Sequence, residues 1–302
     1  MLWIIIILIV LAVWIYVANS CLNLVVKPRI YTEEEIRTEE IEKGFSSAIE
    51  AYENKWQRED FLLDCGDVKI SGEIITNPKA DNKVAIICHG HTVNRFASLK
   101  YAELFYNEGF NVIIYDERHF GRSEGAFSTL GQNESKDLAR IMKFTREKFS
   151  DDCRIVLHGE SMGAATSLLA LRYDRPELVI ADCPFSDNKT LFGEWISKNM
   201  HVPPVLILTM MLPLARIRYD YRIKDTSPLE AVRNTDVPIC FMHGDSDTLI
   251  DCHHSKDMFA VCRNRKSELH LFKGAEHARS IAIDPKGYEA ILRDFLKSCD
   301  ML

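Results

Sequence analysis

The segment from Arg154 to Tyr173, RIVLHGESMGAATSLLALRY, decides the fold. Its first part is an apolar run typical of a buried strand, and the residues after Ser161 are rich in Ala and Leu, which favour a helix. The pattern G-x-S-x-G lies between them, with glycines at 159 and 163. A sharp strand-to-helix turn needs small residues there, because it brings the helix backbone against the strand. The segment therefore predicts a serine nucleophile, Ser161, raised above a sheet.

The same pattern occurs a second time, as GRSEG from Gly121 to Gly125. The apolar run before it ends near Tyr115, and polar or aromatic residues follow that run. The residues after the pattern are rich in Gly, Ser and Thr, which do not favour a helix. We therefore predict that Ser123 lies in a loop and that Ser161 is the reactive serine.

Several other apolar runs are typical of strands, and helical segments separate them: KVAIICHG, NVIIYDE, LVIADCP, PICFMHG and LHLFKGAEH. Uninterrupted apolar strands that alternate with helices indicate a parallel sheet covered on both faces. The run FLLDCGDVKISGEIIT, from Phe61, alternates like an antiparallel pair. The predicted class is α/β, with a mostly parallel central sheet and functional groups beyond the carboxyl ends of its strands.

Five motifs follow one another along the chain in this order: CHGHTVNR, YDERHFGRSEG, GESMGAA, HGDSDTLI and GAEHA. Together they resemble the α/β-hydrolase superfamily, in particular its serine-hydrolase branch with monoacylglycerol-lipase-like and serine-aminopeptidase-like members. The resemblance covers residues 61–302. It implies an α/β-hydrolase fold with a helical cap, whereas the substrate varies widely within that branch.

A serine hydroxyl is a weak nucleophile and needs a base that a third group orients. The chain order in this fold is Ser, acid, His. His277 follows the last apolar run and matches the family pattern, so it is the predicted base. We expect His243, which ends a strand, to be a hydrogen-bonded structural residue, and His253 and His254, which begin a helix, to be solvated caps.

The predicted acid is Asp247, because the family spacing H-G-x-x-D selects it from HGDSDTLID. Asp245 is its main rival. Asp182 and Asp187 remain minor alternatives, since some family members carry the acid after the preceding strand.

An oxyanion hole needs two backbone donors. The residue after the nucleophile, Met162, supplies one of them. By family resemblance, the residue after the first His-Gly pair, His91, supplies the other. Nothing in the sequence suggests a metal or an organic cofactor.

The N-terminus begins with eighteen apolar residues without a charge, MLWIIIILIVLAVWIYVA. As a helix they span about 27 Å, and the following residues can extend the helix across a hydrocarbon core about 30 Å thick. We predict a transmembrane anchor over residues 1–26. A cleaved signal peptide is the less favoured alternative, because a basic n-region is missing. Basic residues follow the span and none precedes it, so the catalytic domain is expected in the cytoplasm.

Residues 27–60 are predicted to form one amphipathic connecting helix, in which Thr32 and Glu35 make a capping-box pattern. Its apolar stripe is expected to pack on the domain that follows. Within that domain, 61–302, residues of about 186–236 are too many for a simple crossover and are predicted to form a cap. The cap is expected either to line an acyl pocket or to dip into the bilayer, or simply to contain a core helix.

Composition excludes some classes of function. The formal net charge of −7 and the lack of a basic face argue against a nucleic-acid binder. Nine cysteines without a C-x-x-C pair are typical of reduced thiols in a reducing compartment. The oligomeric state cannot be inferred from these features.

We therefore expect a membrane-anchored serine hydrolase that cleaves carboxylic esters, acyl or lipid-like, through an acyl-enzyme. The alternatives within enzymes are a peptidase or an acyl-protein thioesterase. The alternative from another class is a catalytically silent, membrane-tethered binding module. Hydrolysis of haloalkanes is disfavoured, because the strand-to-helix turn carries Ser161 rather than an Asp.

Overall fold

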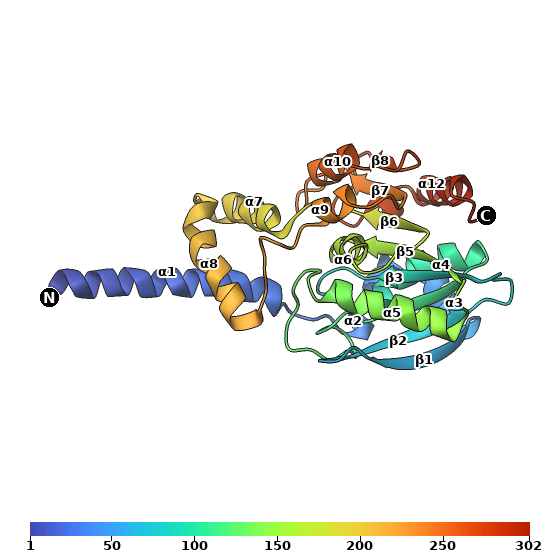
Figure 1. Ribbon diagram of the computed structural model, residues 1–302, viewed down its shortest axis with the longest axis horizontal. Helices are drawn as coiled ribbons and strands as arrows, with labels where there is room; N and C mark the ends of the chain where they lie inside the picture. Colours follow the sequence, from blue (N-terminus) through green and yellow to red (C-terminus); the bar gives the residue numbers. More distant parts are fainter.

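The computed structural model describes residues 1–302 and shows a layered α/β body from which one long helix projects (Figure 1). The body is built on an eight-stranded sheet in the order β1-β2-β4-β3-β5-β6-β7-β8. Only β2 runs antiparallel to its two neighbours, and the other pairs are parallel. The strands are β1 Gln57–Asp64, β2 Lys69–Thr76, β3 Lys83–Cys88, β4 Asn111–Tyr115, β5 Arg154–Glu160, β6 Leu178–Asp182, β7 Ile239–Gly244 and β8 Glu268–Phe272. The predicted class and the α/β-hydrolase fold are confirmed.

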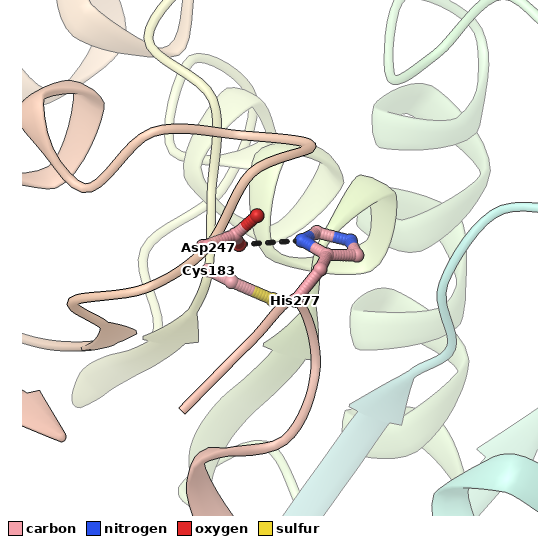
Figure 2. A group of neighbouring side chains, drawn as sticks. All are labelled: Cys183, Asp247 and His277. Carbon is pink, nitrogen blue, oxygen red and sulfur yellow. Dashed lines mark hydrogen bonds and ion pairs between the residues drawn. The ribbon is translucent and has the colours of Figure 1, made fainter. Parts of the chain in front are cut away.

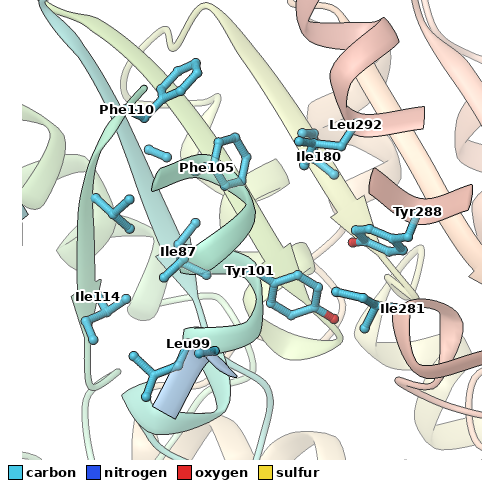
Figure 3. Close-up of a cluster of buried hydrophobic side chains, with 14 of the residues drawn as sticks. Ile87, Leu99, Tyr101, Phe105, Phe110, Ile114, Ile180, Ile281, Tyr288 and Leu292 are labelled. Carbon is cyan, nitrogen blue, oxygen red and sulfur yellow. The ribbon is translucent and has the colours of Figure 1, made fainter. Parts of the chain in front are cut away.

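Two apolar layers cover the two faces of the sheet, and they bury β4, β6 and β7 completely and β5 except for Arg154 at its start. The first layer contains Tyr101, Phe105, Tyr288 and Leu292 (Figure 3). Its helices are α2 Glu33–Glu42, α3 Ser46–Asn54, α4 Leu99–Asn107, α11 Ser280–Ile283 and α12 Pro285–Ser298, with a 3₁₀ turn at Arg95–Ser98 before α4. The helices of the second layer are α5 Glu134–Lys148, α6 Met162–Ala170, α9 Pro228–Arg233 and α10 His253–Ala260.

The connector after the N-terminal helix differs from the single helix predicted for residues 27–60. It contains two helices, α2 and α3, separated at Gly44, whose φ of +97° is a left-handed conformation that glycine adopts readily. The predicted capping box is present, since Thr32 and Glu35 hydrogen-bond to each other's backbone. Ile36 and Ile49 lie in the core beside the sheet. Strand β1 begins at Gln57, four residues before the predicted start of the domain at Phe61.

The cap consists of two helices, α7 Asn188–Met200 and α8 Pro204–Tyr219, which lie apart from the sheet beside the N-terminal helix (Figure 1). The predicted range of 186–236 is too wide. Helix α9 falls inside that range, but its Val232 packs in the layer that covers the sheet, next to residues of α6. A third apolar cluster joins the cap, the loops above the sheet and the end of the N-terminal helix.

The N-terminal helix, α1 Leu2–Val26, is long and apolar enough to cross a bilayer by length and composition. Its first half is exposed on all sides, whereas Ala18, Leu22 and Val26 are fully buried. The helix therefore projects from the body at one end and packs into it at the other (Figure 1).

Candidate active site

Ser161 occupies a strained turn between β5 and α6. Its φ is +56° and its ψ is −114°, a combination that a serine holds only when its surroundings enforce it. A Cβ atom added at Gly159 would lie 2.2 Å from the Gly163 carbonyl oxygen, and one at Gly163 would lie 2.1 Å from that of Cys88. The Ser161 amide also donates a hydrogen bond to the Asp182 carbonyl (2.8 Å). The turn is thus fixed by close backbone packing, and the serine hydroxyl stands above the strand ends.

A chain of hydrogen bonds links Ser161 to His277 and Asp247. His277, in the loop after β8, donates its Nδ1 proton to Asp247 Oδ2 over 2.6 Å (Figure 2). The ring nitrogen left without a proton, Nε2, then accepts the hydroxyl proton of Ser161 over 2.9 Å. Serine, imidazole and carboxylate therefore have the arrangement in which imidazole removes the serine proton and the carboxylate orients the imidazole.

Asp247 is held as a carboxylate. Its side chain is fully buried, and Oδ1 accepts hydrogen bonds from the amides of Leu249 (2.9 Å) and Ile250 (2.8 Å). Burial alone would raise its pKa, but the hydrogen bonds from His243, His277 and the Ile250 amide outweigh burial and hold the pKa well below its ordinary value. The acid therefore stays charged beside the imidazole over the whole neutral range.

Ser123, the alternative serine, and Asp245, the alternative acid, make hydrogen bonds with structural roles and do not contact the His277 ring. The Ser123 hydroxyl donates to the Asp116 carbonyl (2.6 Å) and accepts from the Ser71 amide (2.8 Å), so it ties a loop to β2. Asp245 accepts from the Gly274 amide (2.6 Å) and thereby supports the loop that carries His277.

The remaining candidate acids and bases also have other partners. Asp182 is buried against Tyr101 and Ser280, and Asp187 caps the N-terminus of α7. Burial and the charge of Glu160 raise the pKa of Asp182 to about 6. His243 bonds to the Ser255 hydroxyl and the Ile250 carbonyl, while His253 and His254 both contact Glu194 of the cap helix α7.

The two predicted oxyanion donors, His91 and Met162, line the same cavity as Ser161. Met162 is the first residue of α6, where backbone N–H groups have no acceptor inside the helix. His91 follows β3, and its backbone N–H has no acceptor within the protein. Both amides are therefore free to bind a negative oxygen.

The loop that carries His91 is tied to the end of α1 and to the connector. Burial lowers the pKa of the His91 ring, which is therefore neutral, and its Nε2 donates to the carbonyl oxygen of Val25 (2.8 Å). The Tyr31 amide donates to the Thr92 carbonyl (3.0 Å), and the Asn94 side chain donates to the Tyr31 carbonyl (3.2 Å). Sequence patterns give no signal for these contacts, because they join segments about sixty residues apart in the chain.

Two cavities of opposite character meet at Ser161. One has a volume of about 310 Å³, and thirteen of its fifteen lining residues are hydrophobic. They come from α1, the start of α6, α7, α8 and the loops above the sheet, and include Leu130, Met162, Phe192, Trp195 and Met211. The other has a volume of about 400 Å³ and is mostly polar, with Glu39, Lys43, Glu160, Glu276 and Arg279 in its lining. A substrate whose cleaved bond lies at Ser161 would place an apolar group in one cavity and a polar group in the other.

A buried charge network lies next to the turn that carries Ser161. Glu160, the residue before Ser161, contacts Lys100 Nζ (3.1 Å) and accepts from the Tyr101 hydroxyl (2.6 Å). Burial would raise the Glu160 pKa, but Lys100 and Tyr101 hold it below its ordinary value. Lys100 also pairs with Glu40 of α2 (3.3 Å). None of these residues was identified from sequence, although a charged residue inside the G-x-S-x-G pattern is a signal that could have found Glu160.

Cys183 lies beside the Asp247–His277 pair (Figure 2). Burial, together with the neighbouring carboxylates, raises the pKa of its thiol well above the ordinary value, so the thiol stays protonated. Cys183, Asp247 and His277 lie close enough together to be candidate metal ligands, but His277 Nδ1 and Asp247 Oδ2 are already hydrogen-bonded to each other. A second group of candidate metal ligands, Glu194, His253 and His254, joins the cap to α10.

Comparisons with known proteins identify the family. A sequence model of the prolyl oligopeptidase family matches residues 97–299. This chain belongs to that family. It is an α/β hydrolase of the esterase and peptidase type.

Individual relatives and structures agree with this assignment. The chain is 31% identical over 272 residues to the uncharacterized protein YqkD of Bacillus subtilis, covering 88% of this chain and 87% of YqkD. It is 24% identical to the uncharacterized membrane protein YNL320W of Saccharomyces cerevisiae, over 78% of each chain. Among solved structures, the Pyrococcus furiosus esterase Pf2001 superposes with a TM-score of 0.67 at 25% identity, covering 82% of this chain and 95% of the esterase.

Only Ser161 is expected to react with a fluorophosphonate probe, because it alone of the two G-x-S-x-G serines contacts a histidine. Ser161→Ala should abolish labelling of the full-length protein, measured by in-gel fluorescence. Ser123→Ala is the matched control and should retain most of it. Labelling that persists in Ser161→Ala would refute the assignment of the nucleophile.

Asp247→Asn should lower kcat for a simple ester on the order of 10³- to 10⁴-fold, since the amide no longer fixes the imidazole tautomer. Asp245→Asn should cost far less, because its amide oxygen can still accept the Gly274 hydrogen bond. Steady-state kinetics of both variants make the comparison. A larger loss in Asp245→Asn than in Asp247→Asn would reverse the roles.

Proposed function

We propose that this protein is a membrane-anchored serine hydrolase that cleaves carboxylic esters with an apolar acyl group and a polar alcohol. The observation that carries the proposal is the position of Ser161 between an apolar and a polar cavity. Single acyl chains fit the apolar cavity, whose volume of about 310 Å³ is at the small end of the usual 300–1,000 Å³ for ligand sites.

The proposed reaction has two halves. Ser161 Oγ attacks the ester carbonyl carbon while His277 Nε2 takes the hydroxyl proton. The oxygen that becomes negative accepts hydrogen bonds from the amides of Met162 and His91. The bond to the alcohol oxygen then breaks, and that oxygen takes the proton from His277. Water repeats these steps on the acyl-enzyme, which releases the carboxylic acid and restores Ser161.

The polar cavity supports an alcohol with hydrogen-bonding or charged groups. Lys43 and Arg279 offer positive charge, and Glu39 and Glu276 offer negative charge. Lys43 is held in place by Glu39 (2.8 Å) and Glu40 (2.9 Å). The connecting helix α2 thus contributes to the leaving-group side of the site.

Peptide hydrolysis is a second candidate, favoured by membership of the prolyl oligopeptidase family. Glu39 and Glu276 in the polar cavity could bind the amino group of a peptide. The apolar cavity, which has no charged lining residue, favours an acyl chain over a peptide segment. Thioesters of acylated proteins share the acyl half of the ester and remain a variant of the main proposal.

The substrate class is tested by a turnover panel of esters with acetyl, butyryl, octanoyl and palmitoyl groups, together with a thioester and an aminoacyl amide. We expect kcat/KM for octanoyl to exceed that for acetyl by at least tenfold, since the longer chain fills the apolar cavity. Faster turnover of the amide than of any ester would favour the peptidase. No turnover of the panel by a protein that also resists fluorophosphonate would favour a silent binding module.

We further propose that α1 spans the membrane with the catalytic domain in the cytoplasm, as the basic residues on its C-terminal side favour. The relation to a yeast membrane protein supports a membrane location. In intact cells, an impermeant protease should leave residues 61–302 uncut until the membrane is opened. Digestion of that domain in sealed cells would place it outside, and immunoblotting of the fragments distinguishes the two outcomes.

A further inference from the structure

The last two turns of α1 are built into the active site. Ala18, Leu22 and Val26 are fully buried and share one apolar cluster with Met162, the residue after the nucleophile. The end of the helix is fixed by two hydrogen bonds from loops above the sheet. His91 donates to the Val25 carbonyl (2.8 Å), and the Ser128 amide donates to the Val26 carbonyl (2.9 Å). A helix that served only as a tether would need none of these contacts.

The same turns form one wall of the apolar cavity. Cys21, Leu24 and Val25 line it, opposite residues of the cap. Leu24 is 62% exposed although it lines the cavity, and so is Leu249, at 56%. Two lining side chains of the cavity are therefore exposed on the outside of the protein, and exposed leucines at the mouth of a cavity are unfavourable in water.

The length of α1 indicates what the opening faces. The part of α1 that is exposed on all sides, Leu2–Val13, has twelve residues and a length of about 18 Å. A bilayer core is about 30 Å thick and needs about 20 residues. A spanning α1 must therefore also place residues up to about Cys21 in the hydrocarbon, and these are the residues that pack against the cap.

The cap has features that suit the same depth. Helix α8 lies along the second half of α1, where Trp14 Nε1 donates to the Leu206 carbonyl and the Tyr219 hydroxyl donates to Asn23 (3.0 Å). Val205 and Leu206, at the start of α8, are 64% and 51% exposed. These contacts pair polar groups of the two helices, and Arg218 of α8 also donates to the Asn19 side chain, so the C-terminal end of α8 belongs at the polar surface of the bilayer. The exposed apolar residues of α8 are well placed to lie in lipid.

We propose that α1 is a specificity element as well as an anchor: its last two turns form a wall of the acyl pocket, whose mouth lies at the edge of the bilayer hydrocarbon, within one helical turn of Cys21. The substrate is then an ester already resident in the membrane, whose single acyl chain enters sideways between α1 and the cap. This inference rests on the proposed function, because it assigns a role to α1 only if Ser161 acts on acyl groups.

The test uses the full-length chain in phosphatidylcholine vesicles. Ser161 is labelled with alkyl fluorophosphonates that carry an ethyl or a hexadecyl chain, and the two rates are compared. Leu24→Trp narrows the mouth and should lower the hexadecyl-to-ethyl rate ratio at least tenfold. Leu8→Trp is the matched control, since Leu8 is 59% exposed on the same helix and does not line the cavity. Its ratio should equal that of the wild type.

A second measurement locates the chain directly. A hexadecyl fluorophosphonate with a diazirine near the end of its chain is coupled to Ser161 and irradiated, and the cross-linked residues are identified by mass spectrometry. Cross-links to residues 21–25 of α1 and to lipid are expected. Cross-links confined to the hydrolase body, together with an unchanged rate ratio in Leu24→Trp, would overturn the role of α1 while leaving the esterase intact. Failure of Ser161 to react with either probe would instead overturn the proposed function and this inference with it.

Discussion

The close backbone packing of α6 against β5 and β3 is the constraint on which the active site depends. Residues 159 and 163 are glycines, and a Cβ atom at either position would clash with the neighbouring backbone. Because glycine has no Cβ atom, the chain can turn sharply enough to hold Ser161 in a left-handed conformation. That turn directs the hydroxyl at His277 and leaves the Met162 amide at the start of a helix. Ser161 and the Met162 amide are therefore placed by one local backbone geometry. His277 and Asp247 come from loops after β8 and β7, which parallel pairing brings to the same edge of the sheet.

The buried charge network next to Ser161 joins this turn to the connector. Lys100 is buried between Glu160, the residue before Ser161, and Glu40 of α2. Breaking such a pair leaves an uncompensated buried charge, which commonly costs about 3–5 kcal/mol. The connector is consequently held to the body by a directional contact as well as by the apolar residues Ile36 and Ile49. Its Lys43 can then form part of the polar cavity.

Local patterns predicted the fold and the elbow because those features depend on neighbours in the chain. The strand, the two glycines and the Ala/Leu-rich helix around Ser161 are contiguous, and each apolar run of the sheet is complete in itself. The break at Gly44 was missed because apolar spacing continues through it, and α9 was assigned to the cap because its sequence does not say which surface it covers. Asp247 could be selected from its neighbours only through family spacing. The contact of His91 with Val25 depends on how distant segments pack, which no local pattern encodes.

The end of α1 is tied to the loops around Ser161. Its last carbonyls bind the ring of His91 and the Ser128 amide, and Tyr31, five residues after the helix, binds the backbone of Thr92. The loop that carries His91 is thus held both by the end of α1 and by the connector that follows it. Any tilt of α1 relative to the body would have to strain these hydrogen bonds or the buried packing of Leu22 and Val26. The end of α1 and the loop that carries His91 are therefore fixed relative to each other, and the orientation of α1 relative to Ser161 is set by the same contacts that hold the predicted oxyanion donor.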